Sequence, residues 1–590
     1  MLRLVSLGAL LVLGLYPPPV AASPDPGATT ERIDLSGRSN DDAVPWDFRC
    51  RTGRGCGSWT TIPVPSSWEL QGFGSYAYGT EENPPGDVGE YRLEFEVPAR
   101  WRNRRSWLVF GGVMTDAEVR LNGEILGHHR GAFYPFRFEV SEVLRFPGPN
   151  RLRVLVHEES ADGSVNRAER RADYWIFGGI FRPVWLESRP RESIAAVGLD
   201  PRADGHLRAT VALSGIRTGD RLVGRIETLE GKTVGGSFGT LIPASAGRVE
   251  LVGRIPGVEP WSAEHPQLYR IRLRLLAGNR PLHEITERFG FRTVEIAPSR
   301  GLLINGRKVR LKGVNRHSFW PSSGRTTNPD ISREDVRLLR RMNVNAVRTS
   351  HYPPDEHFLD ACDEAGIYVL DELAGWHDAY DTAAGRPLVR SMVERDRNHP
   401  SVVLWANGNE GGWNRRLDRE FSRFDPQKRP VLHPDATFSG FDTEHYPDWE
   451  ELRNRLGASG PSRWGLASKR PSEIVLPTEI LHSLYDGGGA AGLERFWTAI
   501  RDSPRGGGLF LWAFLDEGVV RTDRGGSIDT AGNRAPDGVV GPFRQPEASV
   551  RGLREIFSPV ELRLPDVLPP GFNGRIGVVN PFDHRTLGGR

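Results

Sequence analysis

From residue 298 to about residue 560, apolar strand-like segments alternate with amphipathic helical segments, and this alternation limits the possible folds more than any other feature. Helical patterns such as 332–343, 354–366 and 493–503 lie between the strand-like segments. Eight strand–helix units over about 260 residues match the roughly 250 residues of a (β/α)₈ barrel, so we predict a TIM barrel. The predicted strands are 308–317, 345–352, 367–373, 401–410, 429–435, 441–446, 473–480 and 508–518.

Polar and aromatic side chains occupy the ends of these predicted strands. Parallel barrel strands are buried on both faces, and their carboxyl ends open into the loops where barrel active sites lie. The side chains at these ends should therefore share one mouth. They are His317, His351, Glu372, Asn409, Glu410, Tyr446, Glu479 and Trp512.

Glu410 and Glu479 form the pair with the clearest chemical meaning. Glycosidic bond hydrolysis with retention needs two carboxyl groups about 5 to 5.5 Å apart, one protonating the leaving oxygen and one attacking the anomeric carbon. Glu410 ends the fourth predicted strand and Glu479 ends the seventh. These strands lie on opposing sides of a barrel mouth, so the two side chains can face each other across a bound sugar ring.

The two roles require different protonation states. A general acid keeps its proton near neutral pH, whereas a nucleophile is ionised. Glu410 follows an apolar run and adjoins Asn409, which favours the acid/base role with a raised pKa; Glu479 is then the nucleophile. Asn409 can bond a sugar 2-hydroxyl, while His482 and Trp512 can flank Glu479.

For several of the other polar residues, a structural role is as well supported as a role in substrate binding. His317 and His351 either bind substrate or are hydrogen-bonded residues of the barrel rim. Glu372 can bond backbone groups or an arginine such as Arg348. The carboxylates to which we assign a structural role are Asp371, Glu372, Asp516 and Glu517.

The chain before the barrel has the period-two alternation of β-structure. Residues 30–190 predict a β-sandwich, with Asn122-Gly123 between alternating runs as the signal of a two-residue hairpin. Residues 191–297 predict a second, smaller, immunoglobulin-like sandwich. Residues 561–590 resemble the start of a further, incomplete β domain.

The first residues have the features of a cleavable export signal. Arg3 precedes an apolar stretch from Leu4 to Leu15, and small residues follow near Ala22, so residues 1–22 predict a signal peptide and a periplasmic or extracellular location. The apolar stretch is shorter than the ~20 residues of a membrane span. Cys50 and Cys56 are predicted to form a small disulfide, and Cys362 to be a buried thiol.

Charge and composition exclude some partners and favour others. The net charge is +2 with acidic and basic residues interspersed, which excludes a basic face for nucleic acid. Sixteen tryptophans provide flat aromatic surfaces that suit the apolar faces of sugar rings. We therefore expect a glycan as partner, no nucleic acid and no membrane span.

Five sequence motifs together resemble glycoside hydrolase family 2, which includes β-galactosidases, β-glucuronidases and β-mannosidases. They are "GVNRH", "NAVRTSHYP", "IYVLDE", "RDRNHPSVVLWANGNE" and "GGGLFLWAFLDEG". The resemblance covers about residues 40 to 560 and implies a jelly-roll sugar-binding sandwich, an immunoglobulin-like sandwich and a TIM barrel. It also implies that Glu410 is the acid/base and Glu479 the nucleophile.

Within the family, β-galactosidases are the most similar group. The resemblance implies substrate contacts by Asn83 in "TEENPPG" and by Asp173 in "ADYWIFGGIFRPV". It implies the same for residues at the barrel mouth, namely His317, His351, Tyr446, His482 and Trp512. The family's metal-binding Glu and His should follow Asp371-Glu372, but Trp376 stands near the place of the carboxylate. We therefore expect no metal cofactor, with a magnesium or sodium ion as the alternative.

The sequence thus predicts an exported, exo-acting, retaining β-glycosidase that removes a terminal β-linked sugar, galactose, from a glycan. A β-glucuronidase or another family 2 exo-β-glycosidase is the alternative enzyme, with Arg521 and Arg524 as candidate partners for a uronate. A catalytically inactive carbohydrate-binding protein is the alternative from another class. The sequence leaves open whether the chain forms a homo-oligomer.

Overall fold

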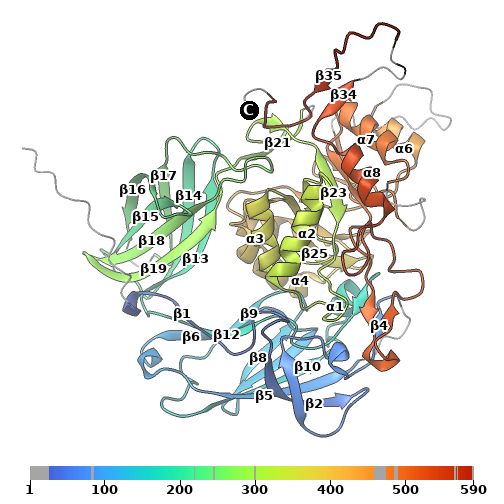
Figure 1. Cartoon of the computed structure of the whole chain (residues 1–590). Coiled ribbons are helices and arrows are strands. Elements are labelled where there is room, and N and C mark those ends of the chain that lie inside the picture. The colour runs from blue at the N-terminus through green and yellow to red at the C-terminus, as the bar shows by residue number, and fades with distance from the viewer. Residues whose placement is uncertain are drawn as a thin grey trace, which may run out of the picture.

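The computed structural model describes residues 26–80, 86–217, 219–243, 246–297, 300–457, 473–483, 490–563, 567 and 569–587. Two sandwiches and a barrel follow one another along the chain (Figure 1). The predicted signal peptide and Asn83 lie outside the described residues.

The first sandwich packs two antiparallel sheets around one core. The Asn122-Gly123 hairpin is formed as predicted, with φ values of 54° and 93° in the left-handed region. The larger sheet has the order β3 (Thr60–Val64), β2 (Val44–Thr52), β5 (Val88–Phe95), β10 (Asn150–His157), β7 (Asp116–Leu121) and β8 (Glu124–Arg130). The facing sheet has the order β1 (Glu31–Asp34), β12 (Val184–Arg189), β6 (Arg105–Phe110) and β9 (Phe136–Glu139).

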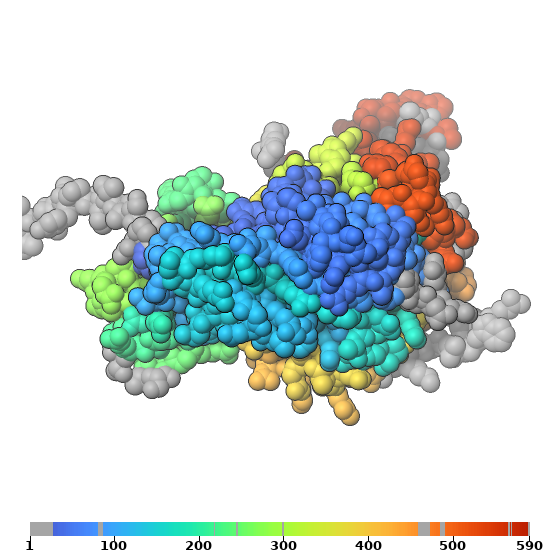
Figure 2. Space-filling model, turned by 90° about the horizontal axis from the view of Figure 1, so that it is seen from below, coloured from blue at the N-terminus to red at the C-terminus, as the bar shows by residue number. Residues whose placement is uncertain are grey.

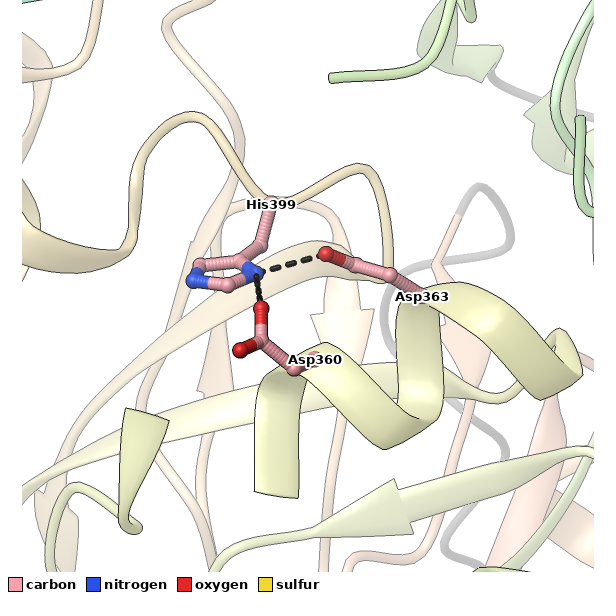
Figure 3. Close-up of side chains that lie close together, drawn as sticks. All are labelled: Asp360, Asp363 and His399. Carbon is pink, nitrogen blue, oxygen red and sulfur yellow. Dashed lines mark hydrogen bonds and ion pairs between the residues drawn. The ribbon is translucent and has the colours of Figure 1, made fainter. Parts of the chain in front are cut away.

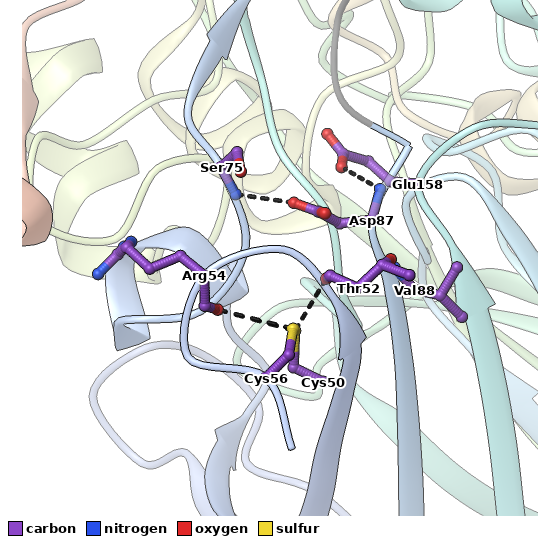
Figure 4. Close-up of a disulfide and its surroundings, with 8 residues drawn as sticks. All are labelled: Cys50, Thr52, Arg54, Cys56, Ser75, Asp87, Val88 and Glu158. Atoms are coloured by element: carbon purple, nitrogen blue, oxygen red, sulfur yellow. Dashed lines mark hydrogen bonds between the residues drawn. A yellow bond between two sulfur atoms is a disulfide. The ribbon is translucent and has the colours of Figure 1, made fainter.

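The predicted disulfide joins Cys50, in strand β2, to Cys56 in the turn that follows (Figure 4). Beside it, the Asp87 carboxylate accepts a hydrogen bond of 2.7 Å from the Ser75 amide. Cys362 is a buried free thiol, as predicted. The disulfide therefore closes a loop at the edge of the sandwich, far in sequence from the barrel.

The second sandwich has a smaller core, lined by alternate residues of its strands. One sheet has the order β13 (Ser193–Pro201), β14 (His206–Ser214) and β17 (Arg248–Arg254). The other has the order β16 (Thr233–Leu241), β15 (Arg221–Thr228), β18 (Tyr269–Ala277) and β19 (Arg280–Phe289). β20 (Val294–Ala297), β21 (Gly301–Ile304) and β22 (Arg307–Lys308) then lead into the barrel.

Each of the eight predicted barrel segments contains a strand, and the ladders between them are parallel. Six strands form one curled sheet in the order β27-β26-β25-β24-β23-β31, and β29 pairs with β30. The fifth, sixth and seventh strands are only two residues long, so regular pairing is weakest on that side. The strands are β23 (Leu311–Asn315), β24 (Ala346–Arg348), β25 (Tyr368–Trp376), β26 (Val402–Asn409), β27 (Val431–Leu432), β29 (Phe441–Asp442), β30 (Ile474–Val475) and β31 (Gly508–Leu511).

Helices surround the barrel, and short elements complete the connections. The helices are α2 (Pro329–Arg341), α3 (Glu356–Ala365), α4 (Thr382–Asp396), α5 (Asp418–Phe424), α6 (Trp449–Arg455), α7 (Leu493–Asp502) and α8 (Ala548–Ile556). Short strands are β4 (Ala77–Tyr78), β11 (Trp175–Ile176), β28 (Thr437–Phe438), β32 (Val519–Val520) and β33 (Ile528–Asp529). Near the C-terminus, β34 (Glu561–Arg563) pairs with β35 (Gly577–Val579). Among the described helices, none combines the length and the apolar character that crossing a membrane requires.

The first sandwich docks on the barrel through a shared apolar core that includes Tyr174 and Trp175 of the sandwich and Tyr352 of the barrel. The Trp175 indole donates a 2.8 Å hydrogen bond to the Glu517 carbonyl. α1 (Gly163–Glu169) lies in the same contact region. Seen from below, the sandwich covers most of the visible face of the molecule (Figure 2). Loops of the sandwich are thereby held against the barrel mouth.

Candidate active site

The apolar run of β26 ends at the barrel mouth and delivers Glu410 there. Every residue of β26 is buried through its last residue, Asn409. The chain then turns sharply, with Glu410 in the left-handed region at φ 43°. At Gly408, an added Cβ would lie 1.9 Å from the Gly412 carbonyl oxygen, so this tight turn requires glycine. A non-glycine residue in this backbone region is strained, which is common at functional sites.

Glu410 and Glu479 face each other across the mouth. One carboxylate oxygen of each lies within 4.8 Å of the other, and a His445 nitrogen lies within the same distance of both. The Glu410 side chain is 20% exposed and that of Glu479 only 4%. This separation fits the ~5 to 5.5 Å of a retaining pair and is shorter than the ~6.5 to 9.5 Å of an inverting one.

Glu479 is held as an anion. Arg348 Nη1 donates to Glu479 Oε1 at 2.7 Å, and the Tyr446 hydroxyl donates to Oε2 at 2.7 Å. Burial by itself raises the pKa of Glu479, but the charges of His445 and Arg348 outweigh burial and lower that pKa below its usual value. An ionised, firmly oriented carboxylate suits the predicted nucleophile.

Glu410 differs from the expectation of a raised pKa. Burial does raise the pKa of its carboxyl, but His445 Nδ1 lies 2.9 Å from Glu410 Oε1, and this hydrogen bond and charge lower the pKa to about 2. His377 Nε2, 3.6 Å from Oε2, acts in the same direction. The prediction considered only the apolar residues preceding Glu410, whereas the decisive neighbours come from other loops.

Arg348 organises the floor of the site. Its guanidinium donates to Glu372 Oε2 at 2.6 Å and to Asn409 Oδ1 at 2.6 Å, in addition to Glu479. Glu372 therefore has the structural role predicted for it, with Arg348 as its partner. Asn409 Nδ2 is buried and has no hydrogen-bond partner among the described residues. This amide donor is available to a sugar hydroxyl, as predicted for Asn409.

Two predicted residues, from the ends of the strands on either side of β23, form an aromatic wall. The rings of His351 and Trp512 stack with centroids 5.2 Å apart, and His351 Nδ1 lies 3.0 Å from Glu372 Oε1. His317 meets the Trp512 ring edge-on at 5.6 Å, and burial together with the charge of Arg325 keeps its pKa well below the usual value. His317 is thus held neutral.

The remaining predicted residues lie around the same mouth. The ring of His482 lies 5.9 Å from that of Tyr446 and 6.5 Å from that of Trp512. Asp173, on a sandwich loop, accepts a hydrogen bond from Tyr78; burial raises its pKa, and the charges of His351 and Glu479 also act on it. The structure therefore brings together every predicted site residue that it describes.

Three comparisons with known proteins match this architecture. Family descriptions of glycosyl hydrolases family 2 match in chain order: the sugar-binding domain at residues 55–190, the central domain at 196–292 and the TIM barrel domain at 294–531. The chain belongs to glycoside hydrolase family 2. The family assignment agrees with the motifs from which the resemblance was drawn.

Relatives within family 2 include β-galactosidases. The chain is 32% identical over 510 residues to the β-galactosidase of Alteromonas mediterranea, covering 79% of this chain and 48% of that protein. It is 33% identical over 559 residues to the β-galactosidase of Arthrobacter sp. strain B7, covering 86% and 53%. This chain therefore corresponds to only about half of the length of either relative.

Solved family 2 structures share the fold. A β-glucuronidase from Ruminococcus gnavus superposes with a TM-score of 0.71 at 22% identity, over 91% of this chain and 99% of that one. A β-glycosidase from Bacteroides vulgatus superposes with a TM-score of 0.73 at 20% identity, over 93% and 78%. At this identity the likeness concerns the fold alone.

Sequence reasoning missed three residues of the site. His445 directly precedes Tyr446, Tyr78 lies in the short sandwich strand β4, and Asp537 follows the last barrel strand. Asp537 Oδ2 accepts a 2.5 Å hydrogen bond from the Trp512 indole, and burial raises the Asp537 pKa well above its usual value. Only His445 carried a usable signal, because it stands at a predicted strand end.

The family's metal position is not reproduced at Trp376. This half-buried side chain packs on His377 with ring centroids 4.0 Å apart, and His377 Nδ1 lies 3.1 Å from the Glu410 carbonyl oxygen. An indole carries no carboxylate oxygen for a hard cation. These residues therefore do not fit the metal that the family implies at this place.

Another acidic cluster is explained by ion pairing. Asp360 and Asp363 of α3 converge on His399 (Figure 3), with His399 Nδ1 2.6 Å from Asp363 Oδ2. Burial lowers the His399 pKa, but the Asp363 charge and hydrogen bond raise it to about 9. Arg288 also pairs with Asp360, so cations of the protein already neutralise this cluster.

Proposed function

We propose that this chain is a retaining exo-β-glycosidase that hydrolyses a terminal β-linked galactose, with Glu479 as nucleophile and Glu410 as acid/base. The observation that carries the proposal is the pair of carboxylates within 4.8 Å of each other at the barrel mouth. The β-galactosidase relatives support the choice of sugar.

Glu479 would attack the anomeric carbon while Glu410 protonates the departing oxygen, and water would then release the sugar with Glu410 as the base. Asn409, through its free amide hydrogens, is positioned to bond the sugar 2-hydroxyl. Such a bond strengthens as positive charge develops on the ring. The Trp512–His351 wall supplies a flat apolar surface for the ring.

The charges of the pocket favour a neutral sugar over a uronate. Asp173 and Asp537 are carboxyls of the rim, and Asp537 lies within 3.8 Å of His482. The predicted uronate partners are occupied, because Arg521 pairs with Asp523 and Asp529. A uronate would place a negative charge beside the anionic Glu479 and beside two carboxyls whose pKa is already raised, which costs free energy in a low-dielectric pocket.

Solved β-glucuronidases have this fold, so the β-glucuronidase alternative has to be tested at the site itself. One arginine near the site would have to serve the uronate: the Arg534 guanidinium lies 5.6 Å from the centroid of the Tyr78 ring. Arg524, the other candidate, pairs with Asp529. We expect Arg534→Gln to leave β-galactoside hydrolysis within about threefold of wild type, whereas a β-glucuronidase would lose its uronate partner.

Exo action is part of the proposal, because the sandwich loop bearing Asp173 lies against one side of the mouth. We propose as substrate an oligosaccharide or polysaccharide-derived glycan outside the cytoplasm. Export rests on the sequence features of residues 1–22. Cleavage of that segment is checked by N-terminal sequencing of the secreted protein.

A panel of aryl β-glycosides, namely galactoside, glucoside, mannoside and glucuronide, tests the function. Wild type should hydrolyse the galactoside fastest, and Glu410→Gln should lose about 10² to 10⁴-fold in kcat/KM. Full activity in either Glu410→Gln or Glu479→Gln would remove these residue roles. Glycan binding without turnover on any substrate would support the inactive binding protein instead.

A further inference from the structure

The Glu410 carboxyl is hydrogen-bonded to the imidazole of His445. The His445 side chain is 4% exposed, and its two ring nitrogens have different partners: Nδ1 lies 2.9 Å from Glu410 Oε1, and Nε2 lies 3.0 Å from Thr478 Oγ1. A general acid must begin the reaction with a proton to give. The location of that proton in this pair is therefore a mechanistic question.

Thr478 fixes the protonation of His445 at Nε2. The Thr478 hydroxyl donates its hydrogen to the Thr443 carbonyl at 3.0 Å, so its oxygen can only accept from His445 Nε2–H. Nδ1 is then either bare or protonated. A bare nitrogen facing a carboxylate at 2.9 Å would place two lone pairs against each other, so one proton must lie in the Nδ1···Oε1 bond.

We propose that His445 is a positioning residue that orients the Glu410 carboxyl and shares with it the single proton delivered to the leaving group. This inference rests on the proposed glycosidase function and deepens it. Histidine suits the role, because it is the side chain whose charge changes closest to neutral pH.

The surroundings of His445 keep that proton close to Glu410. Glu479 Oε2 is the other carboxylate oxygen near His445 Nδ1, and it is farther away, at 3.7 Å. Oε2 of Glu479 is already satisfied by the Tyr446 hydroxyl. The groups that face the pair from other elements are Glu479, Tyr446, His351, His377 and Asp435, the last accepting from the His445 amide.

Protons are conserved over the two steps of the reaction, in which the bond between Glu479 and the sugar forms and is then hydrolysed. In the first, Glu479 bonds the anomeric carbon, the glycosidic C–O bond breaks, and the pair's proton passes to the leaving oxygen. Glu410 is then an anion beside a neutral His445 that carries hydrogen only on Nε2. In the second step, water bonds the anomeric carbon, the bond to Glu479 breaks, and the proton of that water returns to the Glu410–His445 pair.

Leaving-group dependence separates this role from a purely structural one. In His445→Gln, the glutamine amide can still bond Glu410 but holds no transferable proton. We expect kcat/KM to fall about 10² to 10³-fold on a disaccharide or alkyl galactoside, and less than about threefold on a 2,4-dinitrophenyl galactoside, which needs no acid. The alkaline limb of the pH profile should move to lower pH by at least about one unit, because a carboxyl alone then loses the proton.

His433 supplies the matched control. It is also a buried barrel histidine bonded to a carboxylate, with Nε2 2.9 Å from Asp418 Oδ1, but its partner is not a catalytic glutamate. His433→Gln should keep the wild-type limb and leaving-group dependence. If His445→Gln loses activity equally on all substrates with an unmoved limb, the inference is overturned and the glycosidase function stands.

A measurement without substrate tests the shared proton directly. In protein labelled with ¹⁵N-histidine, the His445 signals are identified by their loss in His445→Gln. At pH 7 we expect Nε2 to be protonated and Nδ1 to show a hydrogen-bonded proton that disappears in Glu410→Ala. A bare Nδ1 at pH 7 in wild type would overturn the inference, whether or not the protein hydrolyses any glycoside.

Discussion

Two buried arginine–carboxylate networks in the same barrel have opposite compositions. At Asp335 of α2, one carboxylate serves two guanidinium groups: Arg316 Nη2 donates to Oδ2 and Arg544 Nε donates to Oδ1, both at 2.7 Å. At the mouth, one guanidinium, Arg348, serves the two carboxylates Glu372 and Glu479. The first network has surplus positive charge and the second surplus negative charge.

The two networks also differ in how completely their polar atoms are hydrogen-bonded. Both carboxylate oxygens of Asp335 are bonded, and Arg544 also donates to the Phe319 carbonyl, so the network ties α2 to two loops. Among the described residues, the Asn409 Nδ2 donor of the mouth network has no partner, and the Glu410 side chain is 20% exposed. A fully bonded network stabilises the fold, whereas an incompletely bonded one is prepared for a ligand.

The largest expected effect falls on the mouth network. Glu479→Gln should lower kcat by about 10⁴-fold or more, because the covalent route is lost. The melting temperature should fall by less than about 3 °C, because Arg348 keeps Glu372 as its partner. Kinetics on the aryl galactoside and a thermal melt measure both values, and a large loss of stability would erase the contrast between the two networks.

Asp335→Asn should produce the converse result. It leaves two buried guanidinium groups without a counter-charge, at a cost of about 3 to 5 kcal/mol in the free energy of unfolding. Activity per folded molecule should stay within about twofold of wild type, as measured by urea denaturation and by kinetics below the transition. The control on the same helix is Asp330→Asn, whose exposed pair with Arg333 should contribute less than about 1 kcal/mol.

Glu169 is a third buried carboxyl. It accepts hydrogen bonds from a tyrosine hydroxyl and a backbone amide, whereas the carboxylates of the other two networks pair with arginines. Tyr380 donates to Oε1 at 2.5 Å and the Ala132 amide to Oε2 at 2.8 Å, which joins sandwich to barrel. Burial raises its pKa to about 7. Because the folded pKa is raised, the contribution is complete below the unfolded value of 4.5 and is lost as pH rises toward 7.

Through Glu169, the free energy of unfolding of the wild type should fall by up to about 3 kcal/mol between pH 4.5 and pH 7. Glu169→Gln should therefore remove this part of the fall. The measurement is the melting temperature or urea midpoint of wild type and variant across that range. Parallel pH curves for the two proteins would mean that folding does not raise the pKa of Glu169.

The smallest expected effect concerns metal. We propose that hydrolysis needs no bound cation, because Trp376 replaces a carboxylate at the family's metal position. Dialysis against EDTA should change kcat/KM by less than about twofold, and added Mg²⁺ should not raise it. A tenfold loss that Mg²⁺ restores would show that other residues hold the ion.

The sequence predicted most of the fold because periodic burial is a local property. Alternation predicted the sandwich strands, and the strand–helix repeat predicted all eight barrel strands, including two-residue ones such as β29. The arrangement of site residues also followed, because parallel strands end at one rim. Asn83 lies outside the described residues, so its predicted role stays a prediction.

The electrostatics of the site could not be predicted in the same way. The residues next to Glu410 in the sequence suggested a raised pKa for its carboxyl, but a histidine 35 positions later in the chain lies against that carboxyl. Asp537 and Tyr78 likewise reach the site from distant parts of the chain, Asp537 from a loop and Tyr78 from β4. Such contacts depend on loop conformation, which short sequence patterns do not encode.

The sequence by itself determined which residues stand at the strand ends, because alternation and strand order place each carboxyl end at one rim. Only the tertiary structure decided how those residues are charged. A pKa depends on burial and on charges a few ångströms away, and in a barrel those neighbours come from separate strands. The positions of Glu410 and Glu479 at the barrel mouth were therefore predictable from the chain, whereas the histidine beside Glu410 became visible only in the folded protein.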